Sequence, residues 1–217
     1  MNKWDQIDDE IWGKIICMER NRRVAKAYAR APILTINGCD NGFDGYRIGL
    51  NGFDNPMRDV KTEEVKRSIG LGVKVKMDQD GNIMIKRISK ANVFVKGWSD
   101  VESSDDSGDG YTSTLSSDLI KASGLLEPQK SVKLFDMKKF QSMIHRELRC
   151  AYPDRRKLES QCICCVAFVK DAQDILDIPT WVMIINIVAL DMLKTKLPPS
   201  KPLKCFVQMN LIFLFFS

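Results

Sequence analysis

The 217-residue chain contains one histidine and no long apolar segment. A single histidine, His145, argues against histidine-rich metal sites, because zinc takes about four converging ligands. Seven cysteines, an odd number, indicate a reducing compartment, with cysteines used as small buried groups. Apolar runs such as Leu211 to Phe216 are far below the roughly 20 residues that span a bilayer. We therefore expect no signal peptide, no transmembrane segment, no cofactor, and a cytoplasmic or nuclear location.

The composition is that of an ordinary globular domain, with 44% apolar and 28% charged residues. The net charge of +5 is too mild to indicate nucleic acid as a partner. Composition and pattern divide the chain into an acidic extension (1–10), one domain (11–197) with an acidic, serine-rich insert (99–131), and an apolar tail (198–217).

Short apolar runs alternate with turn signals before residue 99, which is typical of antiparallel β-structure. Val73 to Met77 alternates strictly, and Asp80-Gly81 is a strong hairpin signal. A short helix is predicted from Thr62 to Ile69, with Thr62 as its cap and Gly70 as its stop. Strands are predicted at 12–18, 33–37, 46–50, 73–77, 83–88 and 91–95.

Residues 99–118 hold seven serines and six acidic residues, with no Lys or Arg. Such a segment buries too little apolar surface to order itself. Its acidic context makes three serines candidates for an acidophilic kinase, although a solubilising linker or a loop folded onto the basic helices explains it equally well. These candidate phosphorylation sites are Ser103, Ser104 and Ser107.

The C-terminal half alternates helical and strand patterns. Residues 134–152 carry an apolar stripe at helical spacing, with Asp136 as a plausible N-cap, and Pro153 can open a second short helix. Strands are predicted at 161–169 and 181–187, followed by a helix at 188–197. The run 138–157 holds seven basic residues against two acidic ones, which suits either a solvated helix face or contact with phosphates.

Many short matches in the correct order make the chain resemble the C-terminal (Mad-homology 2) domain of Smad proteins, most of all a divergent insect member. The resemblance covers about residues 11–197. It rests on the opening Trp12-x-x-Ile15-x-x-x-Glu19, then Pro32-x-Leu34-Thr35-Ile36-Asn37-Gly38, Ile69-Gly70-Leu71-Gly72, Val132 to Asp136, Phe168-Val169-Lys170, and Pro179-Thr180-Trp181-Val182.

The resemblance implies a mainly β fold: an antiparallel β-sandwich of the Smad and forkhead-associated kind, with a three-helix bundle at one end and a loop–helix segment at the other. In Smads these ends pack head to tail between subunits, which closes a ring. Solvated helix faces explain the same charges equally well. The oligomer-interface residues carried over are Arg58, Glu63, Glu64, Lys66 and Arg67 at one end and Arg146, Arg149, Arg155 and Arg156 at the other.

Three features depart from the Smad pattern. No N-terminal DNA-binding domain precedes the sandwich, so we expect no direct DNA binding. The chain ends in an apolar run and Ser217, without the Ser-x-Ser motif of receptor-activated Smads. The stretch that corresponds to the phosphoserine-binding loop, 171–178, looks short and carries Asp171, Asp174 and Asp177, which would repel a phosphoserine. Trimer formation driven by a phosphorylated tail is therefore not expected.

The remaining candidate sites favour structural roles. Strand periodicity places Cys162 and Cys164 on one face and Cys165 on the other, which suggests core positions. Nothing in the spacing brings a cysteine to His145, and Gly70-x-Gly72 is too short for a phosphate loop. The tail after residue 202 has an aggregation-prone composition unless it is covered by the sandwich, a membrane surface or a partner.

The sequence thus predicts a non-enzymatic protein–protein interaction module, a signalling adaptor or regulator. Its partners would be proteins, through self-association or Smad-like partners, with weak membrane contact through the tail as a further option. The insect resemblance implies a role in chitin deposition in epithelial tubes. The alternatives are a nuclear transcription co-regulator or a dominant inhibitor in transforming-growth-factor-β-type signalling.

Overall fold

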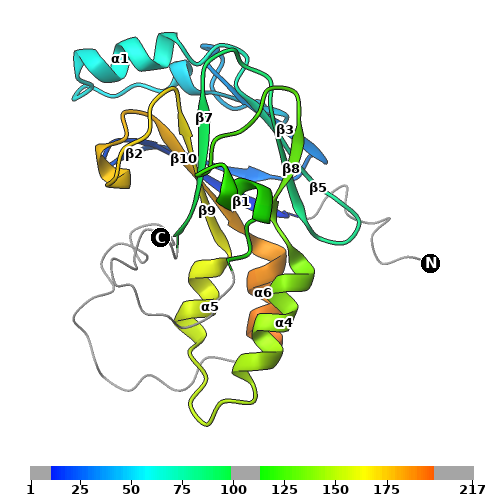
Figure 1. Ribbon diagram of the computed structural model, residues 1–217. Helices are drawn as coiled ribbons and strands as arrows, with labels where there is room; N and C mark the ends of the chain where they lie inside the picture. Colours follow the sequence, from blue (N-terminus) through cyan, green and yellow to red (C-terminus); the bar gives the residue numbers. More distant parts are fainter. Residues whose placement is uncertain (1–10, 99–112, 198–217) are drawn as a thin grey trace.

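The computed structural model describes residues 11–98 and 113–197, which form two five-stranded sheets packed as a sandwich with helices around them (Figure 1). The first sheet has the strand order β2-β1-β10-β9-β7, and the second has the order β4-β3-β5-β6-β8. The predicted β-sandwich is therefore confirmed. All strand pairs are antiparallel except β3 and β4, which run parallel.

Eight of the ten strands that the structure describes lie where the sequence predicted strands. The first sheet contains β1 (Gly13–Glu19), β2 (Arg22–Ala29), β7 (Val93–Gly97), β9 (Ile163–Phe168) and β10 (Trp181–Asn186). The second contains β3 (Ile33–Asn37), β4 (Arg47–Gly49), β5 (Val73–Met77), β6 (Ile83–Arg87) and β8 (Ser131–Phe135).

The two sheets differ in how they are buried. In β5 the valines at 73 and 75 are buried while Lys74 and Lys76 are exposed, so the second sheet has one wet face. In β1, β9 and β10 every residue is buried, so both faces of the first sheet are covered at its centre.

The helices gather at the two ends of the sandwich. At one end lie α1 (Val60–Arg67) and the short η2 (Leu50–Gly52). At the opposite end α4 (Met137–Glu147), α5 (Arg155–Gln161) and α6 (Ile187–Lys196) contact one another (Figure 1). Two short helices, α3 (Ser117–Lys121) and η3 (Ile175–Asp177), lie in connections.

Two predicted helix starts are wrong. Leu134 and Phe135 belong to β8, because this segment pairs with β6; the helix begins only after Asp136, which caps it as predicted. The cap of α1 is Asp59 and not Thr62: the Asp59 carboxylate accepts the Thr62 backbone N–H at 2.9 Å. A carboxylate three residues before the donor offers the better geometry for this bond.

The sequence also missed β2, an edge strand whose residues RRVAKAYA include three basic side chains and only one β-branched residue. The segment 99–112, with Ser103, Ser104 and Ser107, lies outside the described residues. The expectation that 99–118 cannot order itself is wrong for its last residues, since Thr114 and Leu115 are buried against the domain.

Candidate functional site

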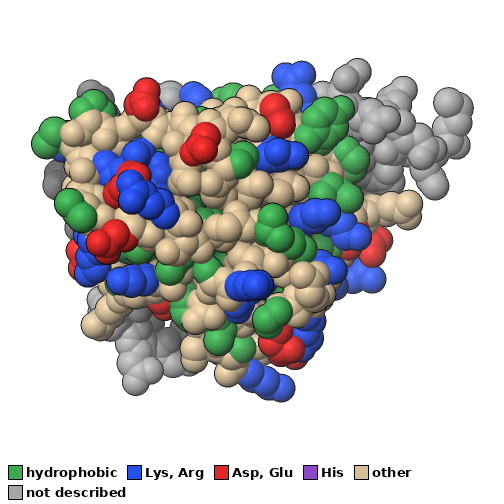
Figure 2. Space-filling model, turned by 90° about the horizontal axis from the view of Figure 1, so that it is seen from above, with side chains coloured by type: hydrophobic (Ala, Val, Ile, Leu, Met, Phe, Trp, Pro, Cys, Tyr) green, Lys and Arg blue, Asp and Glu red, His purple; other side chains and the backbone are tan. Residues whose placement is uncertain are grey.

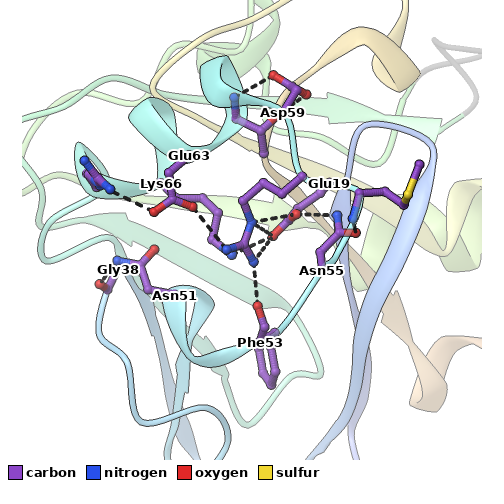
Figure 3. A network of polar contacts seen from close by, with 12 residues as sticks. Glu19, Gly38, Asn51, Phe53, Asn55, Asp59, Glu63 and Lys66 are labelled. Carbon is purple, nitrogen blue, oxygen red and sulfur yellow. Dashed lines mark hydrogen bonds and ion pairs between the residues drawn. The ribbon is translucent and has the colours of Figure 1, made fainter.

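The loop–helix end, residues 51–69, is fastened to the sandwich by one buried carboxylate, that of Glu19 at the end of β1 (Figure 3). Glu19 is 3% exposed, and it accepts hydrogen bonds from Lys66 Nζ at 2.5 Å, from Asn55 Nδ2 at 2.6 Å and from two nitrogens of Arg58 at 3.0 Å. Three segments of the loop and helix thus converge on one side chain. A buried carboxylate whose two oxygens both accept several hydrogen bonds holds the groups that donate them rigidly in place.

The pKa of Glu19 is set by two opposing effects, burial of the carboxylate and the hydrogen bonds that it accepts. Burial acts to raise its pKa, but the hydrogen bonds from Arg58, Lys66 and Asn55 outweigh it, so the pKa lies below its ordinary value. The same contact raises the pKa of Arg58. The carboxylate therefore stays charged wherever the domain is folded near neutral pH.

A second fastening joins the residue after Glu19 to the start of α1. Arg20, which turns the chain into β2 with φ of +51°, donates from Nε to Asp59 at 2.7 Å. This bond, aided by Thr62, holds the pKa of Asp59 well below its usual range. Glu19 at the end of β1 and the next residue, Arg20, therefore both bind the α1 segment.

This anchoring presents a mixed surface to solvent, here called the α1 surface: Met57, Val60, Glu63, Glu64 and Arg67. Met57 and Val60 are 67% and 77% exposed. Arg67 pairs with Glu63 one turn before it, and the surface surrounds a shallow hollow of about 440 Å³. Figure 2 looks onto this end of the molecule, where acidic and basic side chains are interspersed.

The structure divides the interface residues expected at this end into two groups. Lys66 is 2% exposed and Arg58 is largely covered, and both are committed to Glu19. Lys66 therefore lies too deep to touch a partner in this fold, and its charge serves the anchor. Glu63, Glu64 and Arg67 face outward. Glu19 was not predicted as a site residue. The signal available in the sequence was a charged residue that directly follows the apolar run Ile15 to Met18.

The opposite end carries the arginines expected there, here called the arginine surface: Arg146, Arg149 and Arg156, all exposed. Arg155 is engaged within the domain, where it pairs with Glu159 at 2.8 Å and donates to the Leu197 carbonyl. Buried Glu147 accepts the Asp154 backbone N–H and so fixes the turn between α4 and α5. The α1 surface and the arginine surface lie at the two far ends of the molecule (Figure 1).

The acidic loop 171–178 lies beside the loop–helix end. Asp171 pairs with Lys96 of β7 at 2.8 Å, and Asp174 caps η3 by accepting the Leu176 backbone N–H. The Asp177 carbonyl accepts a hydrogen bond from Arg20 at 3.0 Å, so the loop shares a residue with the α1 fastening.

The cysteines and the histidine take structural positions. Cys162, Cys164 and Cys165 are at most 2% exposed, as predicted, and burial raises the pKa of Cys162 and Cys165 well above the ordinary thiol value. His145 is exposed on α4, as expected. Among residues 11–98 and 113–197, no three His, Cys, Asp or Glu side chains converge as metal ligands. No helix in these same ranges is long and apolar enough to cross a membrane.

In comparison with known protein families, residues 10–187 of the sequence match the MH2 domain family. The chain belongs to the MH2 domain family. MH2 domains are non-catalytic protein–protein interaction modules of Smad- and IRF-type signalling proteins.

Solved structures share the fold of this MH2 domain. A chain from the crystal structure of STAT2 in complex with IRF9 matches with a TM-score of 0.57 and 13% identity, over 86% of this chain and 97% of that one. The IAD domain of interferon regulatory factor 9 matches with a TM-score of 0.52 and 13% identity, over 84% and 86%. At such identities the likeness shows the common fold alone.

Proposed function

We propose that this MH2 domain is a signalling adaptor that self-associates head to tail, with the α1 surface of one copy against the arginine surface of the next. The observation that carries the proposal is the anchoring by Glu19, which fixes an outward-facing acidic and apolar surface at the end opposite to the arginines. Two different surfaces at opposite ends make a heterologous contact, which forms a ring when the rotation between copies closes.

Charge gives this contact its orientation. Glu63 and Glu64 on α1 are complementary to Arg146 and Arg149 on α4 and the adjoining turn. Exposed ion pairs contribute only about 0–1 kcal/mol each, so these charges mainly set the register and the rate of encounter.

Apolar side chains at both ends would supply the buried area of the contact, while the charges orient the two copies. Met57 and Val60 stand out from the α1 surface, and Leu148 and Tyr152, 45% and 93% exposed, stand beside the arginine surface. Large side chains at the centre of an interface contribute most of its free energy.

The association would not depend on a phosphorylated tail. Asp174 and Asp177 are exposed in the loop that corresponds to the Smad phosphoserine-binding loop. In the same loop, Asp171 already forms an ion pair with Lys96. Carboxylates at this place oppose the binding of a phosphate group.

The test is the solution mass of the full chain by light scattering as concentration rises. We expect a trimer that becomes a monomer in Glu63→Lys/Glu64→Lys, and also in Arg146→Glu/Arg149→Glu. Mixing the two variants should restore binding between unlike copies, because each retains one intact surface and the reversed charges oppose each other. Three copies cannot alternate around a ring, so the mixture should form pairs and alternating chains rather than the closed trimer. Lys74→Glu/Lys76→Glu, a double charge reversal on the exposed face of the second sheet, is the matched control.

A natural chain that stays monomeric at millimolar concentration would contradict the proposal. So would variants that assemble as the natural chain does. Charge reversal at Lys66 is unsuitable here, because it would break the internal anchor rather than the contact.

Which signalling process the adaptor serves is a separate and more specific proposal. A nuclear co-regulator or a dominant inhibitor of Smad complexes would use the same two surfaces, and stimulus-dependent nuclear entry with binding to a phosphorylated Smad would favour the first. Acidophilic phosphorylation of Ser103, Ser104 or Ser107 would add charge to the insert without changing either surface. Chitin deposition in epithelial tubes rests on the insect resemblance alone.

A further inference from the structure

The outward face of the second sheet carries basic side chains on four of its five strands. Lys74 and Lys76 of β5 are exposed to solvent, and the register pairs Lys74 with Lys86 of β6 and Lys76 with Met84. Paired residues of neighbouring strands project from the same side of a sheet, so the register identifies the other members of this face. Its charged residues, here called the basic face, are Arg47, Lys74, Lys76, Lys86 and Lys133.

The strands of this sheet contain no acidic residue to balance these charges. Their sequences, ILTIN, RIG, VKVKM, IMIKR and SVKLF, hold six Lys or Arg and no Asp or Glu. The sixth basic residue, Arg87, is buried and donates to three backbone carbonyls, so it is not part of the face. The other five are therefore a one-sign array on a surface of the sheet.

Carboxylates near this sheet lie in the connections around it. Asp136, just after β8, pairs with Lys133 at 3.0 Å. Asp44 accepts two backbone N–H groups at the start of β4. Asp78 and Asp80 lie in the turn between β5 and β6, where Asp78 accepts hydrogen bonds from the turn itself. These carboxylates compensate the rim of the basic face and leave its centre positive.

The central lysines oppose one another without a counter-charge. Lys74 lies directly opposite Lys86, and like charges in that position destabilise a sheet. Across residues 11–98 and 113–197, no carboxylate lies within ion-pair distance of Lys74, Lys76 or Lys86. The fold gains nothing from this repulsion, whereas an anionic ligand outside the molecule would relieve it.

We propose that the basic face docks the domain onto membrane surfaces that contain anionic lipids. Four of its five charged residues are lysines. Their compact ammonium groups suit diffuse attraction to many headgroups, whereas recognition of a single phosphate or carboxylate favours the planar fork of arginine. The charges extend over four strand spacings, which is about 19 Å at about 4.8 Å each, so they form a broad surface.

Exposed apolar side chains accompany the lysines. Ile33, which pairs with Lys76, is 49% exposed, and Tyr46, immediately before β4, is 71% exposed. Phe43, which bridges to Ile48 of the same edge strand, is 40% exposed. Aromatic and aliphatic groups beside lysines are typical of binding in the headgroup layer of a membrane, where apolar groups insert and ammonium groups stay at the surface.

The position of the basic face favours a lipid surface over an added peptide strand. β5 and β6, which carry the three central lysines, are interior strands, so their backbone groups are already paired on both sides. A peptide that extends a sheet needs a free edge. In Figure 1, β3, β5 and β8 lie on the flank between the two helical ends, so head-to-tail association would leave this face open. The proposal is independent of that association, because it uses neither the α1 surface nor the arginine surface.

Cosedimentation of the full chain with lipid vesicles tests the proposal. At about 0.1 M salt we expect binding to vesicles that are about one-third phosphatidylserine in phosphatidylcholine, and none to phosphatidylcholine alone. Lys74→Glu/Lys76→Glu should weaken this binding at least about tenfold, because each basic residue near an anionic surface contributes about a fivefold gain. Lys61→Glu/Lys170→Glu, the same change of charge at two exposed lysines outside this sheet, should weaken it less than about threefold.

The melting temperature separates lost binding from lost folding. Lys74→Glu/Lys76→Glu should melt no lower than the natural chain, because the carboxylate at position 74 faces Lys86 and replaces a repulsion by an attraction. Lower affinity for the vesicles with an unchanged or higher melting temperature therefore assigns the loss to the basic face.

Three results would overturn the proposal. The first is a natural chain that does not bind the phosphatidylserine vesicles, including the case in which it binds soluble polyglutamate instead, which would assign the face to an acidic protein segment. The second is equal weakening in the two double variants, because net charge rather than this face would then be responsible. The third is full binding by Lys74→Glu/Lys76→Glu, which would place the lipid contact elsewhere in the chain.

Discussion

The Lys66 ammonium of α1 and the Glu19 carboxylate of β1 lie 2.5 Å apart, 47 residues distant in sequence and both nearly excluded from water. This pair ties the helix to the sandwich and fixes the direction in which Glu63, Glu64 and Arg67 point. The contact surface that we propose on α1 is thus held in place by internal charges that lie beneath it.

Removing Glu19 should destabilise the domain far more than removing an exposed charge. Glu19→Ala leaves buried Lys66 without its partner, and breaking a buried pair in this way costs about 3–5 kcal/mol. Arg67→Ala removes only an exposed pair with Glu63 and should change the free energy of unfolding by less than about 0.5 kcal/mol. Urea unfolding of both variants measures the difference, and equal losses would show that Glu19 is not the anchor.

Stability should fall as pH drops below about 5. The pKa values of Glu19 and Asp59 are lower in the folded domain than their ordinary values of 4.5 and 3.8. The unfolded chain therefore takes up protons first, and the stabilisation, complete above these ordinary values, is lost as pH falls through the folded ones.

The contribution of Asp59 to this pH dependence can be separated from the rest. Asp59→Asn keeps a side chain that can cap α1 but cannot titrate, so its stability should fall less steeply between pH 5 and pH 3 than that of the natural chain. Urea unfolding at each pH measures the slope. Identical slopes would mean that the pair with Arg20 does not lower the pKa of Asp59.

Two glycines with the same backbone angle should respond differently to alanine. Gly70 and Gly72 both have φ of +61°, but a Cβ at Gly70 meets open space, whereas one at Gly72 would overlap the Ile36 carbonyl. Gly70→Ala should cost about 1 kcal/mol of backbone strain, and Gly72→Ala should cost several times as much because β3 must also shift. Thermal unfolding of the two variants decides this, and similar melting temperatures would refute the close approach.

Thiol reactivity should separate surface from core at pH 8. Burial raises the pKa of Cys17 from 9.0 to about 12, which lowers its thiolate fraction about a thousandfold. Cys150 is exposed at the end of α4 and should be modified first. Timed labelling with mass spectrometry checks the order, and early modification of Cys17 would show that the inner face of the sheet opens readily.

Local patterns were sufficient for much of the fold. The alternation in Val73 to Met77 and the Asp80-Gly81 turn predicted β5 and its hairpin with β6, because a half-buried strand shows in its period. β2 was missed for the converse reason, since an edge strand with one partner needs few apolar residues. Leu134 and Phe135 fit both helical and strand patterns, and only pairing with β6 distinguishes the two.

The candidate site was predictable only in outline. The family resemblance located the loop–helix end and the arginine surface, but it grouped Lys66 with Arg67, one residue apart on the same helix. Their roles differ because neighbouring helical positions point about 100° apart, so one faces the sandwich and the other faces water.

The sequence by itself determined the class of fold and the MH2 family, because strand period, turn residues and motif order are local properties that each segment carries with it. Tertiary structure alone decided which charges are internal and which are presented, since burial depends on segments that meet from distant parts of the chain. Glu19, Arg58 and Lys66 read as three ordinary surface charges until the fold brings them together out of water.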